Sequence, residues 1–363
     1  MIKVCFFSGD ITRSGGTERV ATLIANELQN NTEYDVSFVS LTEEKENTFY
    51  CLDKNIKRYK LYDKPVRGIT HYFGYVKRLK KIVKDNNIRI LIDIDGIIDM
   101  YSVPIKKSTG VKIISWEHFN YYFHPAQRLR KLVRRYAVNK VDAIVTLTEE
   151  DKGYYEKNLS FKCPIKCIYN PVVWKQRVAE YNKKSRMILS IGRLTYQKGF
   201  DMLIEAAKIV VEKNKDIKWI ILGEGEERKL LEEKVKNYGL NDNIIFVGNV
   251  NNVDEYYKDA ALFVMSSRFE GLPMTLLETK PYNLPIISFK CKTGPSELIA
   301  DGVNGYLIEE GNISEMASKI SELMNDSERR QEFSGNANIG MDKFEIKNIM
   351  RKWCDLLDAL AKP

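Results

Sequence analysis

The chain has 363 residues, of which 44% are apolar and 29% charged, and these values exclude a disordered, collagen-like or coiled-coil protein. At about 150 residues per domain, the length predicts two domains. The formal charge of +8 is unevenly placed, because residues 1–174 hold 29 basic and 20 acidic residues, whereas residues 175–363 hold 28 and 29. A basic first half and a neutral second half indicate two domains with different partners.

Short apolar runs alternate with longer amphipathic stretches, a pattern typical of βαβ units and parallel sheets. In the first half, strands are predicted at Lys3–Ser8, Asp35–Leu41, Ile88–Ile92, Lys112–Ser115 and Ala143–Leu147. A helix is predicted over Thr17–Gln29, with Thr17 as its N-cap. The joint between the halves is expected near Asn170 and Pro171, before a polar segment at 175–185.

The second half shows the same alternation more clearly. Strands are predicted at Met187–Ile191, Lys218–Leu222, Ile244–Val247, Leu262–Met265, Pro285–Phe289 and Gly305–Ile308. Helices are predicted at Phe200–Lys213, Glu226–Tyr238, Val253–Ala260, Met274–Tyr282, Pro295–Ile299 and Ser314–Asn325. Two doubly wound sheets follow, and ligands bind such sheets at the carboxyl ends of their strands.

Targeting signals and cysteines indicate the compartment. No stretch approaches the ~18–20 continuous apolar residues of a membrane span, and the apolar start Met1–Ser8 is too short for a signal peptide. The six cysteines are scattered, and Cys163 and Cys167 lack a second pair at zinc-finger spacing. We therefore expect reduced thiols, no zinc site and a cytoplasmic location.

Loops in both halves of the chain carry residues suited to an anionic, sugar-bearing ligand. Gly15 and Gly16, after the first strand, would let a phosphate approach backbone N–H groups at a helix start, although a plain tight turn is the alternative. The loop lacks the dinucleotide glycine pattern, which argues against a nicotinamide cofactor. Arg193 and Lys198 follow the first strand of the second half and could clamp a diphosphate, or could be two solvated surface charges.

The segment Ser266–Glu278 is the most informative. Glu270 lies in a loop after an apolar strand, and Glu278 lies about one turn into the following helix. One carboxylate can accept from sugar hydroxyls and the other from ribose hydroxyls. The backbone of residues 271–275 would offer N–H groups at the helix start.

These motifs together resemble the family 4 retaining glycosyltransferases, the Leloir enzymes with nucleotide-sugar donors, over essentially the whole chain. The resemblance includes Gly192-Arg193, Lys198-Gly199, Gly223-Glu224-Gly225, Phe246-Val247-Gly248 and Phe269 to Glu278. It implies an α/β protein of the GT-B fold, with two facing Rossmann-like, doubly wound parallel-sheet domains and a cleft between them. The acceptor-side domain would hold residues 1–171 and a C-terminal helix at 342–363, and the donor-binding domain residues 172–341.

The resemblance also implies residue roles. Arg193 and Lys198 would bind the donor diphosphate, Glu278 the ribose and Glu270 the sugar hydroxyls, while His118 would contact the sugar near the reacting carbon. The implied catalytic residues are His118, Glu270, Arg193 and Lys198. The implied donor-binding residues are Gly15, Gly16, Arg193, Lys198, Val250, Glu270, Gly271, Leu272, Pro273, Met274, Thr275 and Glu278. No metal or other cofactor is expected, and Asp93-Ile94-Asp95 is interpreted as a chance match to the D-x-D metal motif of another glycosyltransferase fold.

A basic stretch at 124–140 holds six Lys and Arg residues and no acid. On a helical wheel, Leu129, Leu132, Val133 and Tyr136 share one face, opposite the basic residues. The cations Arg128, Arg130, Lys131, Arg134 and Arg135 are predicted to meet anionic lipid or a lipid-linked diphosphate, with a plain solvated helix as the alternative. Nucleic acid is not expected, because no stacking platform accompanies the charge.

We therefore predict an enzyme, cytoplasmic and peripheral on the inner face of the cell membrane, that serves surface polysaccharide assembly. It would transfer a hexosyl or N-acetylhexosaminyl unit from a UDP-sugar to a hydroxyl of a glycan acceptor on a lipid carrier, with retained anomeric configuration. A catalytically inert partner subunit that binds a glycan or lipid, and a nucleotide-sugar epimerase, are the alternatives.

Overall fold

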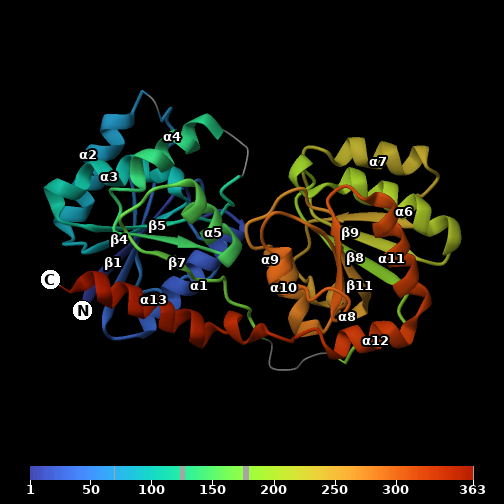
Figure 1. Cartoon of the computed structure of the whole chain (residues 1–363). Helices are drawn as coiled ribbons and strands as arrows, with labels where there is room; N and C mark the ends of the chain where they lie inside the picture. Colours follow the sequence, from blue (N-terminus) through green and yellow to red (C-terminus); the bar gives the residue numbers. More distant parts are fainter. Residues whose placement is uncertain (69, 123–126, 175–179, 363) are drawn as a thin grey trace. The chain divides into compact units, whose positions relative to one another are not determined.

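The computed structural model describes residues 1–68, 70–122, 127–174 and 180–362, which form two compact units (Figure 1). Unit 1 comprises Met1–Pro171 and Ile346–Pro363, and unit 2 comprises Val172–Glu345. The final helix begins at Ile346, four residues later than the expected boundary at 342. Residues 342–345 belong to unit 2 because Phe344 is buried there and Glu345 bridges to Val172.

Unit 1 contains a parallel sheet that has seven strands in the described residues. They are β1 (Ile2–Ser8), β2 (Tyr34–Ser40), β3 (Lys57–Lys60), β4 (Ile90–Ile94), β5 (Lys112–Trp116), β6 (Ala143–Thr146) and β7 (Ile165–Cys167), in the order β3-β2-β1-β4-β5-β6-β7. All five residues of β4 are buried, as expected for an inner strand of a sheet covered on both faces. The edge strands β3 and β7 escaped sequence prediction because one is polar and the other only three residues long.

The helices of unit 1 cover both faces of this sheet (Figure 1). They are α1 (Gly16–Asn30), α2 (Tyr72–Asp85), the 3-10 turn η1 (Gly96–Ile98), α3 (Asp99–Thr109), α4 (Gln127–Ala137), α5 (Glu149–Asn158) and α13 (Ile346–Ala361). The N-cap of α1 is Gly15, and no side chain caps the helix. The prediction of Thr17 as N-cap is therefore wrong, because the helix begins before Thr17.

Helix α13 belongs to unit 1 although it ends the chain. The ring of Trp353 is fully buried and meets the ring of Trp116, at the end of β5, edge-on at 4.9 Å. The hydroxyl of Tyr34 in β2 donates to Asp358 at 2.8 Å. These contacts join the last helix to the sheet formed by the first half of the chain.

Unit 2 contains a second parallel sheet, with six strands in the described residues. They are β8 (Met187–Ile191), β9 (Lys218–Leu222), β10 (Ile244–Gly248), β11 (Ala260–Met265), β12 (Ile286–Lys290) and β13 (Gly305–Glu309), in the order β10-β9-β8-β11-β12-β13. Each of these strands matches a predicted one to within two residues at either end. Two parallel, helix-covered sheets confirm the predicted α/β class.

The helical segments of unit 2 are shorter on average than predicted. They are η2 (Tyr196–Lys198), α6 (Phe200–Lys213), α7 (Arg228–Asn237), α8 (Asp254–Asp259), α9 (Met274–Thr279), η3 (Lys280–Tyr282), α10 (Pro295–Leu298), α11 (Ile313–Asn325), α12 (Ser327–Gly335) and η4 (Met341–Phe344). The helix predicted over 274–282 divides into α9 and η3 because Pro281 lacks the N–H needed to continue the α-helical hydrogen bonds.

The strand order determines where a site can form in each unit. In unit 1 the chain leaves β1 and β4 in opposite directions across the sheet, and in unit 2 it does so at β8 and β11. Such switch points open a crevice at the carboxyl ends of the two strands. The loops that begin at Gly9 and Asp95 lie there in unit 1, and those that begin at Gly192 and Ser266 lie there in unit 2.

Among the described residues, no helix is both long enough and apolar enough to cross a lipid bilayer.

Candidate active site

The glycine loop after β1 is held by a buried carboxylate. Asp10 accepts hydrogen bonds from the backbone N–H and the hydroxyl of Thr12, at 2.8 and 2.6 Å, and from the N–H of Glu44 at 3.0 Å. The hydroxyl of Tyr50 donates to the carbonyl of Ser14 at 3.0 Å. The loop is thus fixed from its own residues and from the segment after β2.

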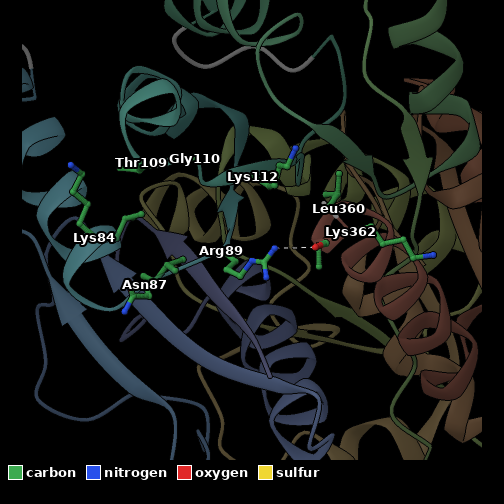
Figure 2. A pocket seen from close by; sticks show the side chains of 11 residues that line it. Lys84, Asn87, Arg89, Thr109, Gly110, Lys112, Leu360 and Lys362 are labelled. Carbon is green, nitrogen blue, oxygen red and sulfur yellow. Dashed lines mark hydrogen bonds between the residues drawn. The ribbon is translucent and has the colours of Figure 1, made fainter.

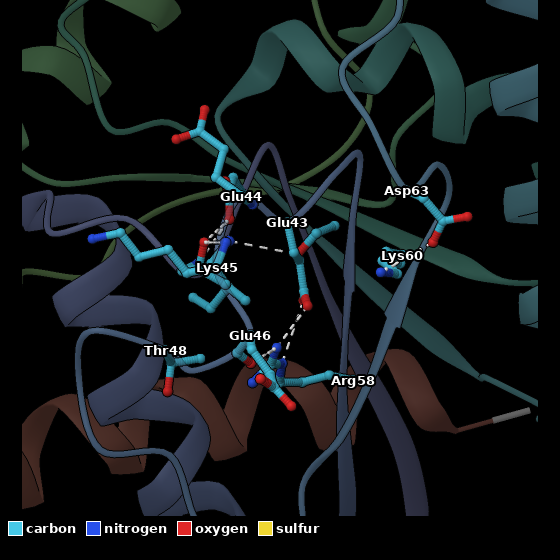
Figure 3. A network of polar contacts seen from close by, with 12 residues as sticks. Glu43, Glu44, Lys45, Glu46, Thr48, Arg58, Lys60 and Asp63 are labelled. Carbon is cyan, nitrogen blue, oxygen red and sulfur yellow. Dashed lines mark hydrogen bonds and ion pairs between the residues drawn. The ribbon is translucent and has the colours of Figure 1, made fainter.

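The segment after β2 has a polar network of its own (Figure 3). Arg58 in β3 donates to Glu43 at 2.6 Å and to the carbonyl of Glu46 at 2.8 Å. Glu43 also accepts from Ser40 at 3.3 Å. These contacts hold the segment after β2, and that segment in turn holds the glycine loop. Gly15 and Gly16 therefore lead into α1 from a preorganised turn.

His118 lies just beyond the end of β5, and only 8% of its surface is exposed. Burial lowers its pKa from 6.5 to about 4, although the negative charge of Asp95 acts in the opposite direction. Its ring lies 4.4 Å from the ring of Trp116. The Nε2 atom is buried and makes no hydrogen bond with the described residues. The imidazole is therefore neutral at pH 7.

Asp95, at the end of β4, is held in an unusual backbone conformation. It is a non-glycine residue with φ of 85°, which costs on the order of 1–3 kcal/mol. Arg130 on α4 binds both of its carboxylate oxygens, at 2.5 and 2.6 Å. A fork-to-carboxylate pair of this kind is both strong and directional, so α4 fixes the loop beside His118.

The carboxylates of the D-x-D match have different partners. Asp93 is fully buried, receives a hydrogen bond from Ser102 and lies beside the buried Asp99, whereas Asp95 binds Arg130. Burial raises the pKa of Asp93 to about 7 and, together with the charge of Asp93, raises that of Asp99 well above its usual value. No group of three or more His, Cys, Asp or Glu side chains suited to a metal ion occurs in the described residues.

In unit 2, the loops after β8 and β11 bring two predicted site residues into contact. Nζ of Lys198 lies 2.6 Å from Oε1 of Glu270, and both side chains are largely buried. Gly199, with φ of 64°, permits this approach, because a Cβ at that position would lie 2.1 Å from the carbonyl oxygen of Ser266. Arg193, in contrast, is exposed.

Glu278 lies in α9, and the hydroxyl of Tyr257 donates to its Oε2 atom at 3.1 Å. Tyr257 in α8 is buried and stacks on Tyr282 at 4.9 Å. Of the predicted donor-binding residues around the start of α9, Leu272 and Pro273 are buried and Gly271, Met274 and Thr275 are half-buried. Pro273 has no backbone N–H and so cannot serve as one of the backbone donors. Val250 is half-buried in the segment between β10 and α8.

Arg268 is a residue of this site that sequence reasoning did not single out. Its guanidinium binds both carboxylate oxygens of Asp201 at 2.8 and 2.7 Å, and lies 4.1 Å from the centre of the Tyr196 ring. Although burial acts to raise the pKa of Asp201, the Arg268 cation lowers it below its usual value. Arg268 thus ties the loop of Lys198 to that of Glu270, but its partner lies 67 residues away in sequence, so no local signal predicts it.

A basic hollow of unit 1 lies at the other edge of the sheet (Figure 2). Its volume is about 430 Å³, and its cations are Lys84, Arg89, Lys112 and Lys362. Arg89 donates to the carbonyl of Ala361 at 3.0 Å, and the lysine side chains point away from one another. This hollow is therefore separate from the carboxyl edge that carries Gly15 and His118.

Helix α4 is oriented differently from the wheel-based expectation. Val133 is buried as expected, but Leu129, Leu132 and Tyr136 are 45%, 64% and 40% exposed. Arg130 and Arg134 face the protein instead, because each finds an acidic partner there, Asp95 and Glu117 respectively. The outward face is consequently both apolar and basic.

Comparisons with known proteins agree with the fold. Residues 174–339 match the family model described as glycosyl transferases group 1, and residues 14–173 match glycosyltransferase family 4. An uncharacterized glycosyltransferase of Haemophilus influenzae is 33% identical over 98% of this chain and 100% of its own length. The chain therefore belongs to the family 4 glycosyltransferases and is a glycosyltransferase of the GT-B fold.

Two further similarities are more specific. The GalNAc-alpha-(1->4)-GalNAc-alpha-(1->3)-diNAcBac-PP-undecaprenol alpha-1,4-N-acetyl-D-galactosaminyltransferase of Campylobacter jejuni is 28% identical, with 98% of each chain covered. A mutant TarM of S. aureus, crystallised with fondaparinux, alpha-GlcNAc-glycerol and UDP, has a TM-score of 0.85 at 18% identity and covers 99% of this chain and 100% of its own. The latter likeness concerns the fold.

Proposed function

We propose that this glycosyltransferase moves a hexosyl or N-acetylhexosaminyl unit from a UDP-sugar to a hydroxyl of a glycan carried on a lipid, in surface polysaccharide assembly. The observation that carries the proposal is the contact of Lys198 with Glu270 at the switch point of unit 2, with Glu278 on the helix that follows. The cation can bind a diphosphate, and the two carboxylates can accept hydrogen bonds from sugar hydroxyls. The UDP in TarM and the PP-undecaprenol named for the Campylobacter relative support the donor and the acceptor.

The proposed chemistry places the donor on unit 2, residues 172–345, and the acceptor on unit 1, residues 1–171 with the C-terminal helix. Lys198, Arg193 and the backbone N–H groups of residues 271, 272, 274 and 275 would stabilise charge on the leaving diphosphate. This is expected to be the largest electrostatic contribution. Glu270 would orient the sugar and Glu278 the ribose. His118, neutral at pH 7, would offer a hydrogen bond to the donor sugar through its unpaired Nε2. Retention of the anomeric configuration is the family expectation.

We further propose a location on the cytoplasmic face of the cell membrane. The outward face of α4 supports it, because Leu129, Leu132 and Tyr136 are exposed beside Arg128, Lys131 and Arg135. Exposed apolar groups with surrounding cations are suited to an anionic bilayer surface. The cysteines are free thiols, which is consistent with a reducing compartment.

The test is a transfer assay with a panel of UDP-sugars and a polyprenyl-diphosphate-linked glycan acceptor. We expect release of UDP that depends on the acceptor, and an α-linked product by NMR if the UDP-sugar donor is α-linked. Lys198→Ala and Glu278→Ala should abolish most of the activity, whereas Lys319→Ala, which removes an ion pair with Glu322 in α11, should not. Interconversion of UDP-sugars without an acceptor would instead indicate an epimerase, and donor binding without turnover an inert subunit.

A further inference from the structure

A cavity of about 230 Å³ lies beside α4 in unit 1, and none of the residues assigned to the proposed donor site lines it. It is lined by Tyr121, Tyr122, Lys131, Arg134, Arg135, Asn158 and Leu159. We propose that this cavity, hereafter the α4 pocket, binds the phosphate groups of a polyprenyl-type diphosphate ester. This inference rests on the proposed function, because it names the part of the lipid-linked acceptor that unit 1 would hold.

The aromatic wall of the α4 pocket is rigid. Tyr121 is fixed by its backbone N–H, which donates to the buried Asp151 at 2.6 Å. The rings of Tyr121 and Tyr122 meet edge-to-face at 5.1 Å. Asn158, at the end of α5, donates to the hydroxyl of Tyr122 at 3.3 Å and to the carbonyl of Tyr154 at 2.7 Å. The pocket is therefore preformed, which lowers the entropy cost of binding a ligand.

The three cations of the pocket differ in their partners. Arg134 is largely buried, donates to the carbonyl of Tyr121 at 2.8 Å and lies 3.8 Å from Glu117, so its charge is already partly balanced. Lys131 and Arg135 make no ion pair or hydrogen bond with the described residues, and both are exposed at the mouth. The pocket therefore offers two uncompensated positive charges next to phenol hydroxyls.

A general helix effect explains only part of this arrangement. Arg134 and Arg135 lie in the last turn of α4, where cations stabilise a helix through its dipole whatever the ligand. Lys131 lies one turn earlier, and neither the cavity nor its tyrosines follow from the dipole. A phosphate dianion, with several acceptor oxygens, matches a lysine, an arginine fork and tyrosine hydroxyls together.

The rim of the pocket favours a lipid-linked phosphate over a free one. Leu159 forms part of the pocket lining, and Leu132, which does not line the pocket, is strongly exposed on α4. A hydrocarbon chain that leaves the phosphate would therefore pass over apolar side chains. The same outward face of α4 is the one proposed to meet the bilayer.

The test is calorimetric binding of farnesyl diphosphate, inorganic pyrophosphate and farnesol to the full chain. We expect the double variant Lys131→Gln with Arg135→Gln to bind farnesyl diphosphate at least about tenfold more weakly than the unmodified protein. Lys157→Gln is the matched control, because Lys157 is exposed in the last turn of α5, next to the lining residue Asn158, but does not itself line the pocket. It should change the affinity less than about twofold. Urea unfolding of each variant verifies that the fold is kept.

The arms of the experiment separate the possible outcomes. Tighter binding of farnesyl diphosphate than of pyrophosphate, with none of farnesol, supports the lipid-linked ester, whereas equal binding of both diphosphates points to free phosphate and overturns the lipid assignment. An equal loss of affinity in the Lys157→Gln control, also seen with phosphatidylglycerol vesicles, would show a general effect of surface charge and overturn the pocket.

UDP binding is measured in parallel, and UDP should not displace farnesyl diphosphate. If UDP fails to bind while farnesyl diphosphate binding depends on Lys131 and Arg135, the proposal of the α4 pocket is supported. The proposed use of a UDP-sugar donor is then refuted. Displacement by UDP would mean that the pocket accepts any diphosphate.

Discussion

Single residues in unit 2 set the geometry on which the proposed donor site depends. Lys198 and Glu270 come from segments that follow different strands, β8 and β11, and Lys198 ends the 3-10 turn η2. Arg268 joins the segment of Glu270 to that of Lys198 through its contacts with Asp201 and Tyr196. Sequence patterns identified Lys198 and Glu270 because both stand next to glycines in recognisable loops. They did not identify Arg268, whose importance comes from a partner on another element.

The first prediction concerns Arg268→Lys. Lysine keeps the charge but cannot bind both oxygens of Asp201 or stack on Tyr196, so the two loops should loosen. We expect UDP to bind about tenfold more weakly by calorimetry. Arg329→Lys serves as the control, because Arg329 also lies over an aromatic ring, Phe333, and pairs with Glu332 elsewhere in unit 2. Unchanged UDP affinity in Arg268→Lys would contradict the positioning role.

The second prediction concerns the protonation of His118. Its pKa is lowered to about 4 by burial, so the folded state binds fewer protons than the unfolded state between about pH 4 and pH 6.5. The stability that His118 contributes is therefore lost as the pH falls through this window. NMR of labelled histidines should show the His118 ring still neutral at pH 5. On acidification from pH 7 to pH 4, the free energy of unfolding of His118→Gln should fall by up to about 3 kcal/mol less than that of the unmodified protein. Titration of His118 near pH 6.5 would refute its burial.

At the scale of elements, α4 shows where a helical wheel fails. The wheel sorts residues by polarity and so predicts an inward apolar face. In the structure the acidic groups Asp95 and Glu117, at the ends of neighbouring strands, attract Arg130 and Arg134 inward. Leu129 and Leu132 are turned outward as a consequence. The pattern of one helix cannot reveal this, because the carboxylates that decide the orientation belong to other elements.

The third prediction tests that orientation. Arg130→Gln leaves the carboxylate of Asp95 largely buried and unpaired, in a backbone conformation that already carries strain. We expect a loss of about 2–4 kcal/mol in the free energy of unfolding. Arg135→Gln, on the outward face of the same helix, should cost less than about 0.5 kcal/mol. Urea unfolding measures both variants. Equal losses in the free energy of unfolding would show that Arg130 and Arg135 are equally exposed to solvent.

At the scale of the whole molecule, the chain is two Rossmann-like units with separate cores. Each unit has its own cluster of buried apolar residues, and the C-terminal α13 adds Ile349, Trp353 and Leu357 to the buried residues of unit 1 after the chain has passed through unit 2. The aromatic contact of Trp353 with Trp116 joins α13 to β5.

The fourth prediction follows from this connectivity. Trp353→Ala should remove about 3–5 kcal/mol from the stability of unit 1, because it empties a fully buried site. In calorimetry the transition of unit 1 should move to lower temperature while that of unit 2 stays in place. Trp219→Phe is the reciprocal variant, since Trp219 is fully buried in unit 2 and donates to Ser190 at 3.0 Å. A single transition shifted equally by both variants would contradict independent cores.

The sequence by itself determined the α/β class, most of the strands, the loops near Gly15, His118, Lys198 and Glu270, and the helix that carries Glu278. It could do so because strand periodicity and glycine-rich turns are local, and because parallel strands place their following loops at one edge. The tertiary structure alone decided the contact of Lys198 with Glu270, the clamp by Arg268, the burial that keeps His118 neutral and the outward face of α4. Each of these depends on the charge or the volume of a partner distant in sequence, and only the packed fold brings such partners within a few ångströms.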